Sequence, residues 1–179
     1  MNSLMIFHFG NQNHLKRDWT LWSKSEKNTI HGDIMLSKDF KEFLELLNEN
    51  KVKYLVVGGY AVAFHGHPRY TKDIDVWIEL SPDNANNLLN ALKKFGFGSL
   101  GLKPDDFLEI DQIIQLGYPP NRIVILTTLK DLKFEDCYKT KVEVEIQGLH
   151  INFIDIENLK KNKRATGRPQ DLADAENLE

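Results

Sequence analysis

The pattern of hydrophobic positions changes from irregular to regular near Met35. Between residues 1 and 34 the apolar residues keep neither the period of a strand nor that of a helix. After Ser37, a suitable N-cap, four apolar residues recur at the spacing of one helix face: Phe40, Phe43, Leu44 and Leu47. We therefore divide the chain into an N-terminal extension of unknown order, residues 1–34, and one domain, residues 35–179.

Short apolar runs alternate with helical patterns through this domain. A helix is expected after Ser81-Pro82, where the serine can cap and the proline can occupy the first turn. Two more are expected on either side of Gly167, and short ones at 60–64 and 132–138. Strands are expected at 54–57, 74–80 and 123–128, with a hairpin formed by 142–146 and 149–154. This order predicts an α/β (α+β) fold in which helices flank a short mixed β-sheet.

Composition and charge exclude several classes of protein. Hydrophobic residues make up 41% and charged residues 27%, and the net charge of −3 argues against a protein that coats nucleic acid by charge alone. Cys137 is the single cysteine, which excludes an internal disulfide framework. We expect no signal peptide from residues 1–10, and no apolar run approaches the ~20 residues that cross a bilayer. A cytoplasmic protein without a membrane partner is expected.

The candidate chemistry lies between Val57 and Val76. Gly58 and Gly59 follow a buried strand at the start of a helix, where glycine lets the backbone approach a phosphate closely. Asp73 and Asp75 begin the next strand, and residues two apart in a strand point to the same face. Paired carboxylates of this kind can hold Mg²⁺ while the other ligand positions go to water and substrate phosphates. The combination indicates phosphoryl or nucleotidyl transfer.

These residues resemble a known signature. The run Val57-Gly58-Gly59, a 13-residue spacer and then Asp73-Ile74-Asp75-Val76 resemble the motif of the DNA polymerase β-type nucleotidyltransferase superfamily. Segments 117–122 and 162–174 resemble its small, single-domain bacterial members, so the resemblance covers about residues 35–179. It implies Mg²⁺-dependent transfer of a nucleoside monophosphate from a nucleoside triphosphate to a hydroxyl acceptor. It also implies that Asp73 and Asp75 are the catalytic metal ligands and that Gly58 and Gly59 hold the triphosphate.

Five further residues are candidates for contacts with the nucleotide. Tyr60 could contact the sugar or complete the packing beside the glycines. Arg69 and Lys72 could meet phosphates, or be solvated loop charges or partners of Asp73. The resemblance places Lys163 and Arg168 in a C-terminal element beside the active site. Their basic segment, 160–168, could equally be a solvated helical face.

One departure from the superfamily pattern concerns a third carboxylate. The resemblance places it directly after Arg122-Ile123, where this chain has Val124. That acid orients or deprotonates the attacking hydroxyl, so its loss affects catalysis more than nucleotide binding. Glu143 and Glu145 share one strand face and could substitute, although alternation in a half-exposed hairpin also explains them.

Three hypotheses for function remain. The first is a minimal nucleotidyltransferase whose acceptor is RNA, such as tRNA, a protein or a small molecule. Because similar members occur in toxin–antitoxin or phage-defence pairs, a cognate partner protein is expected. The second is a non-catalytic relative that binds nucleotide or a partner and has lost the third carboxylate at Val124. The third, a metal-dependent phosphatase or glycosyltransferase, is disfavoured by Arg69-Tyr70-Thr71-Lys72, since such phosphatases need an apolar strand before the acidic pair.

Overall fold

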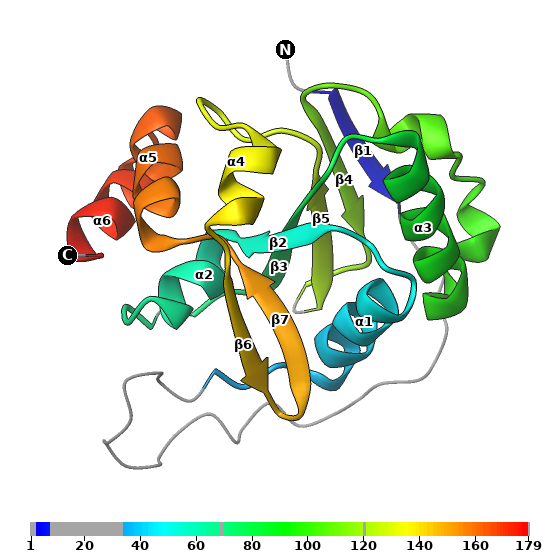
Figure 1. Ribbon diagram of the computed structural model, residues 1–179, viewed down its shortest axis with the longest axis horizontal. Coiled ribbons are helices and arrows are strands. Elements are labelled where there is room, and N and C mark those ends of the chain that lie inside the picture. Colours follow the sequence, from blue (N-terminus) through cyan, green and yellow to red (C-terminus); the bar gives the residue numbers. More distant parts are fainter. Residues whose placement is uncertain (1–2, 8–33, 69, 120, 179) are drawn as a thin grey trace.

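A seven-stranded mixed sheet organises the protein (Figure 1). The computed structural model describes residues 3–7, 34–68, 70–119 and 121–178. Parallel and antiparallel pairings alternate across the sheet, starting with a parallel pair at β1. The strands are, in spatial order, β1 (Ser3–Phe7), β4 (Gln112–Leu116), β5 (Arg122–Leu126), β3 (Asp73–Ile78), β2 (Tyr54–Val57), β7 (Leu149–Phe153) and β6 (Val142–Ile146). The predicted α/β fold with a mixed sheet is confirmed.

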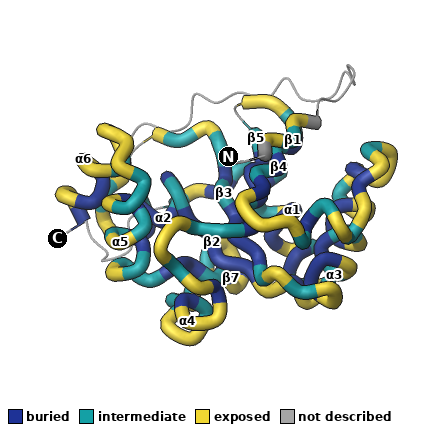
Figure 2. The backbone as a smooth tube through the Cα atoms, turned by 90° about the horizontal axis from the view of Figure 1, so that it is seen from above, coloured by how far each residue is buried: buried dark blue, intermediate teal, exposed yellow. Residues whose placement is uncertain are grey.

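The helices lie in two groups on opposite sides of the sheet (Figures 1 and 2). One group is α1 (Lys38–Glu49) and α3 (Pro82–Leu92), which pack on each other. The other comprises α2 (Gly58–Phe64), α4 (Phe134–Lys139), α5 (Ile156–Thr166) and α6 (Pro169–Asn177). After α3 the chain makes a π turn, Lys93–Phe97, and two short 3₁₀ turns, Gly98–Leu100 and Pro104–Phe107. No helix in the described residues combines the length and apolar character needed to span a membrane.

The helix boundaries follow from local chemistry that the sequence contains. Ser37 Oγ accepts a hydrogen bond from the Phe40 amide at 3.2 Å, and Ser81 Oγ accepts one from the Asn84 amide at 3.3 Å. Each bond satisfies one of the free N–H groups at a helix start. Gly167 ends α5 with a φ of 69°, a left-handed conformation that favours glycine. All four apolar residues of the predicted α1 face are buried in the core. These predictions are confirmed.

Two strands were not predicted. The strand β4 presents buried and half-buried residues alternately, starting with the polar Gln112. The strand β1 comes from the N-terminal extension and pairs in parallel with β4, from Ser3 opposite Gln112 to Phe7 opposite Leu116. Residues 8–33 lie outside the described residues. The division of the chain at residue 35 therefore stays a prediction. The structure shows in addition that residues 3–7 of the extension form an edge strand of the sheet.

Candidate active site

The two predicted ligand carboxylates lie at the start of β3, on one face of the sheet. Asp73 and Asp75 are half-buried, whereas Ile74 between them is fully buried in the core. The next residue on that face, Trp77, is 1% exposed; its ring packs edge-on against Phe134 of α4, and its Nε1 donates to the Thr127 carbonyl at 3.2 Å. Because Trp77 and α4 close the far end of this face, the accessible part is the end that holds the two carboxylates.

Gly58 lies directly against the Asp75 carboxylate. The antiparallel pairing of Val57 with Asp75 brings the end of β2 to this point. Gly58 has a φ of 60°, and a Cβ atom built on it would lie 2.7 Å from Asp75 Cγ, closer than atoms can pack. Only glycine suits this position, for its backbone conformation and for the space it leaves. The glycine turn and the acidic pair, 14 to 17 positions apart in sequence, thus form one site.

Gly59 fits against the loop that leads into β3. It is buried, and a Cβ atom on it would lie 2.8 Å from Thr71 Oγ1. The same hydroxyl donates to the Asp73 carbonyl at 3.1 Å. Thr71 therefore connects the second glycine to the backbone of the first acidic residue. No feature of the sequence pattern singled out this threonine.

Arg122 is a site residue that the sequence pattern indicated only as part of the segment 117–122. In the parallel pairing of β3 with β5, Asp73 lies opposite Arg122. Arg122 Nε donates to Asp73 Oδ1 at 3.0 Å and its Nη2 donates to Oδ2 at 2.5 Å. Both carboxylate oxygens therefore contact one guanidinium, in the side-on geometry that makes this pair strong.

Val124 lies opposite Asp75 in the same register, where the superfamily resemblance expects the third acid. It is buried, with 6% of its surface exposed. The suggestion that Glu143 and Glu145 substitute for this acid is wrong. Both lie on β6, three strands from β3 and so roughly 14 Å away at the usual strand spacing. The described residues contain no group of three or more His, Cys, Asp and Glu placed to hold a metal.

The donor set of Asp73 and Asp75 nevertheless fits Mg²⁺. This ion is commonly held by one or two carboxylates, with its remaining positions filled by water and substrate phosphates. The missing side chain at Gly58 lets the Asp75 carboxylate lie directly against the backbone, where any Cβ would collide with it. Two carboxylates on one face, next to backbone that can approach closely, match what a metal-bound triphosphate needs.

The remaining predicted residues near the glycines differ in accessibility. Tyr60 on α2 packs edge-on against Phe40, with ring centroids 5.7 Å apart, and burial raises the pKa of its hydroxyl to about 12. Tyr60 therefore completes the packing beside the glycines, which was one of its two expected roles. Its hydroxyl stays protonated at neutral pH. Lys72 is exposed, one residue before Asp73. Arg69 lies outside the described residues.

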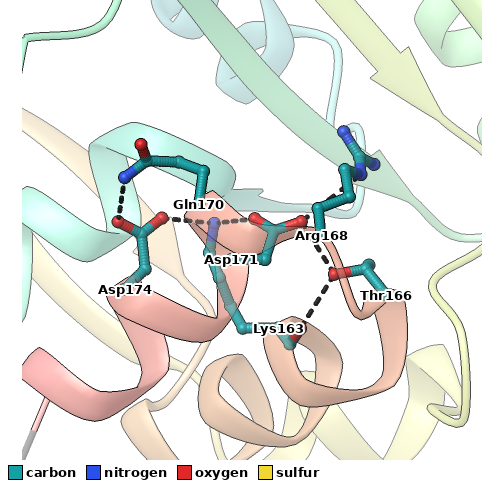
Figure 3. Close-up of polar contacts among 6 residues, drawn as sticks. All are labelled: Lys163, Thr166, Arg168, Gln170, Asp171 and Asp174. Atoms are coloured by element: carbon teal, nitrogen blue, oxygen red, sulfur yellow. Dashed lines mark hydrogen bonds and ion pairs between the residues drawn. The ribbon is translucent and has the colours of Figure 1, made fainter.

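Lys163 and Arg168 belong to an ion-pair cluster between α5 and α6 (Figure 3). Lys163 is 4% exposed, and its Nζ donates to Asp171 at 2.6 Å and to Asp174 at 2.8 Å. Thr166 Oγ1 also donates to Asp171, at 2.7 Å. Lys163 is therefore not part of a solvated face, whereas Arg168, with 76% of its side chain exposed, lies at the outer side of the cluster.

The balance of effects keeps Asp171 ionised. Burial alone raises the pKa of this carboxyl, but hydrogen bonds from Lys163 and Thr166 and the charges of Lys163 and Arg168 outweigh it. The pKa of Asp171 is therefore lowered from its ordinary value. The buried Lys163 thus joins α5 to α6 through its pairs with Asp171 and Asp174.

The family model described as "nucleotidyltransferase of unknown function (DUF6036)" matches residues 35–179, and the chain belongs to this family. The chain is also similar to the crystal structure of an antigenic nucleotidyltransferase-like protein from Paracoccidioides brasiliensis. That similarity has 19% sequence identity and a TM-score of 0.48, and it covers 80% of this chain and 77% of the other. A comparison with curated proteins gave no match.

Proposed function

We propose that the protein is a Mg²⁺-dependent nucleotidyltransferase of the DNA polymerase β type. It would transfer a nucleoside monophosphate from a nucleoside triphosphate to a hydroxyl acceptor. The observation that supports this best is the contact between Gly58 and the Asp75 carboxylate. It joins a backbone segment suited to phosphate to a carboxylate pair suited to a divalent cation.

Each site residue has a role in this proposal. Asp73 and Asp75 hold the metal, which, when bound, neutralises charge on the triphosphate. The backbone at Gly58 and Gly59 cradles the phosphates, and Tyr60, packed edge-on against Phe40, borders the place where the sugar would lie. Lys72 and Arg168, both exposed cations, pair with phosphate oxygens. Lys163 supports the α5–α6 turn on which Arg168 stands.

The reaction forms one bond and breaks one. The acceptor oxygen bonds to the α-phosphorus while the bond from that phosphorus to the bridging oxygen of pyrophosphate breaks, and pyrophosphate leaves. Because Val124 cannot accept a proton, the acceptor proton passes to water. Rate acceleration then depends on positioning and charge neutralisation, which can supply most of the catalysis in this class of reaction.

The acceptor and the partner protein complete the proposed function. We propose an RNA acceptor, such as tRNA, or a protein acceptor, and a cognate partner protein of the toxin–antitoxin kind, in the cytoplasm. The exposed cations Lys161, Arg164 and Arg168 on and after α5 support an anionic acceptor.

The test is transfer of label from α-³²P nucleoside triphosphates to components of a cell extract, with and without Mg²⁺. We expect Mg²⁺-dependent labelling that is lost in Asp73→Asn and Asp75→Asn. The matched control is Asp105→Asn, an exposed aspartate on a 3₁₀ turn outside the site, which should label like the unchanged protein. Labelling that persists in both site variants would rule out the assignment.

A second function is favoured by one observation, the buried valine opposite Asp75. In a non-catalytic relative, the site would bind nucleotide or a partner without transfer. Val124→Asp distinguishes the two functions, because the register places the new carboxylate beside Asp75. Activity that appears only in Val124→Asp supports the non-catalytic relative, whereas activity in the unchanged protein excludes it.

A further inference from the structure

Arg122 holds the first ligand carboxylate from a fixed position in the sheet. Its Nε and Nη2 contact the two oxygens of Asp73, and its Nη1 donates to Gln115 Oε1 of β4 at 3.4 Å. Contacts on two neighbouring strands restrict the guanidinium to one place. The parallel register of β3 and β5 sets that place directly opposite Asp73.

This ion pair is not needed to hold the strands together. The strands β3 and β5 pair over five consecutive positions, and most of the residues involved are buried. The Arg122 side chain is 31% exposed and that of Asp73 is 23% exposed, so this pair lies at the accessible end of a strand pairing that the buried core already supports. The arrangement therefore calls for an explanation other than strand pairing.

The consequence concerns electrostatics at the metal site. Asp73, Asp75 and Arg122 together carry a single negative charge, and Val124 adds none. A free divalent cation that approaches Asp73 meets a fixed positive charge on the same carboxylate. A metal already bound to a triphosphate brings several negative phosphate oxygens, and a guanidinium pairs well with phosphate.

We infer that Arg122 makes the site select the metal–triphosphate complex over the free metal ion. The cation repels free metal from the two carboxylates and attracts the phosphates of the complex, so that the metal enters with the nucleotide. Arg122 is thus a specificity-determining residue of the site. This inference rests on the proposed function, because it assumes that Asp73 and Asp75 bind a metal-bound triphosphate.

The test compares two affinities in the same variants. Free Mn²⁺ is titrated and followed by the electron paramagnetic resonance signal of the unbound ion. A Mn²⁺ complex of a non-hydrolysable nucleoside triphosphate is titrated by calorimetry. For Arg122→Gln we expect free Mn²⁺ to bind at least about tenfold more tightly and the complex to bind about tenfold more weakly. A merely structural role for Arg122 would weaken both.

Two variants separate charge from shape and from folding. Arg122→Lys keeps the charge, so free Mn²⁺ should bind as weakly as in the unchanged protein even if Arg122→Gln fails to fold. Lys94→Gln removes one positive charge from an exposed position just after α3 and should change neither affinity. Thermal unfolding of each variant, measured by circular dichroism, checks that the fold is kept.

The outcomes distinguish the inference from the proposed function. If Asp75→Asn leaves binding of the complex unchanged, the proposed function is wrong. If Asp75→Asn abolishes binding of the complex, the proposed function stands. The inference alone is then overturned if Arg122→Gln does not increase the affinity for free Mn²⁺, or if Arg122→Lys does increase it. Opposite shifts of the two affinities in Arg122→Gln support it.

Discussion

Replacing Gly58 by alanine perturbs the site at the contact on which the account depends. The new methyl group meets two obstacles. The backbone has a φ of 60°, which alanine adopts only with strain, and the methyl would lie 2.7 Å from Asp75 Cγ. Asp75 must therefore turn away from the glycine, and its carboxylate leaves the position where we place the metal.

The size of the effect follows from these two costs. A left-handed backbone costs an alanine roughly 1–2 kcal/mol. Forcing the Asp75 side chain off its rotamer adds about 0.5–1.5 kcal/mol. We expect Gly58→Ala to lower the free energy of unfolding by roughly 1.5–3.5 kcal/mol, which at about 3 °C per kcal/mol lowers the melting temperature by about 7 °C.

Gly101→Ala is the matched control. Gly101 has a φ of 69°, and a Cβ atom there would meet nothing within 4 Å. Both substitutions share the backbone strain and the effect on the unfolded chain, so their difference measures the contact with Asp75. Thermal unfolding by circular dichroism, with calorimetric binding of a Mg²⁺–triphosphate complex, measures both consequences. Equal melting temperatures in the two variants, with complex binding intact in Gly58→Ala, would refute the reasoning.

Three further predictions concern stability. Lys163→Met should lower the free energy of unfolding by about 3–5 kcal/mol in chemical denaturation, because it removes the buried cation that pairs with two carboxylates of α6. The pKa of Asp171 is lowered in the fold, so its contribution to the free energy of unfolding is complete at neutral pH and is lost as the pH falls below its ordinary value of 3.8. Urea unfolding between pH 6 and pH 3 should show this loss of stability. The loss should be smaller in Asp171→Asn. Gln112→Met should raise the free energy of unfolding by about 1 kcal/mol, because both amide atoms of Gln112 are buried and lack a hydrogen-bond partner among the described residues. An unchanged or lower melting temperature for Gln112→Met would show that the amide is satisfied.

The parts of the fold that depend on local signals were predictable. Ser37, Ser81 and Gly167 determine helix ends through bonds and angles within a few residues. The strand β1 could not be predicted this way. Its Leu4 and Ile6 are exposed, and it forms only because the edge of β4, more than 100 residues away in sequence, is available for pairing.

The candidate site shows the same limit. The sequence placed Asp73 and Asp75 on one strand face because the period of a strand is local. The contact of Arg122 with Asp73 depends on the register of β3 against β5, which no sequence pattern specifies. Likewise, the burial of Lys163 results from how α6 folds back on α5 after Gly167, whereas its basic neighbours made the segment look solvated.

The most direct test of the account is a set of triphosphate titrations with and without Mg²⁺. Each of the four common nucleoside triphosphates is titrated by calorimetry into the unchanged protein and into the Asp73→Asn/Asp75→Asn double variant. The account predicts that at least one triphosphate binds only when Mg²⁺ is present, and that the double variant loses this binding. Binding that is indifferent to Mg²⁺, or that survives in the double variant, would contradict a metal-dependent nucleotide site at these two carboxylates.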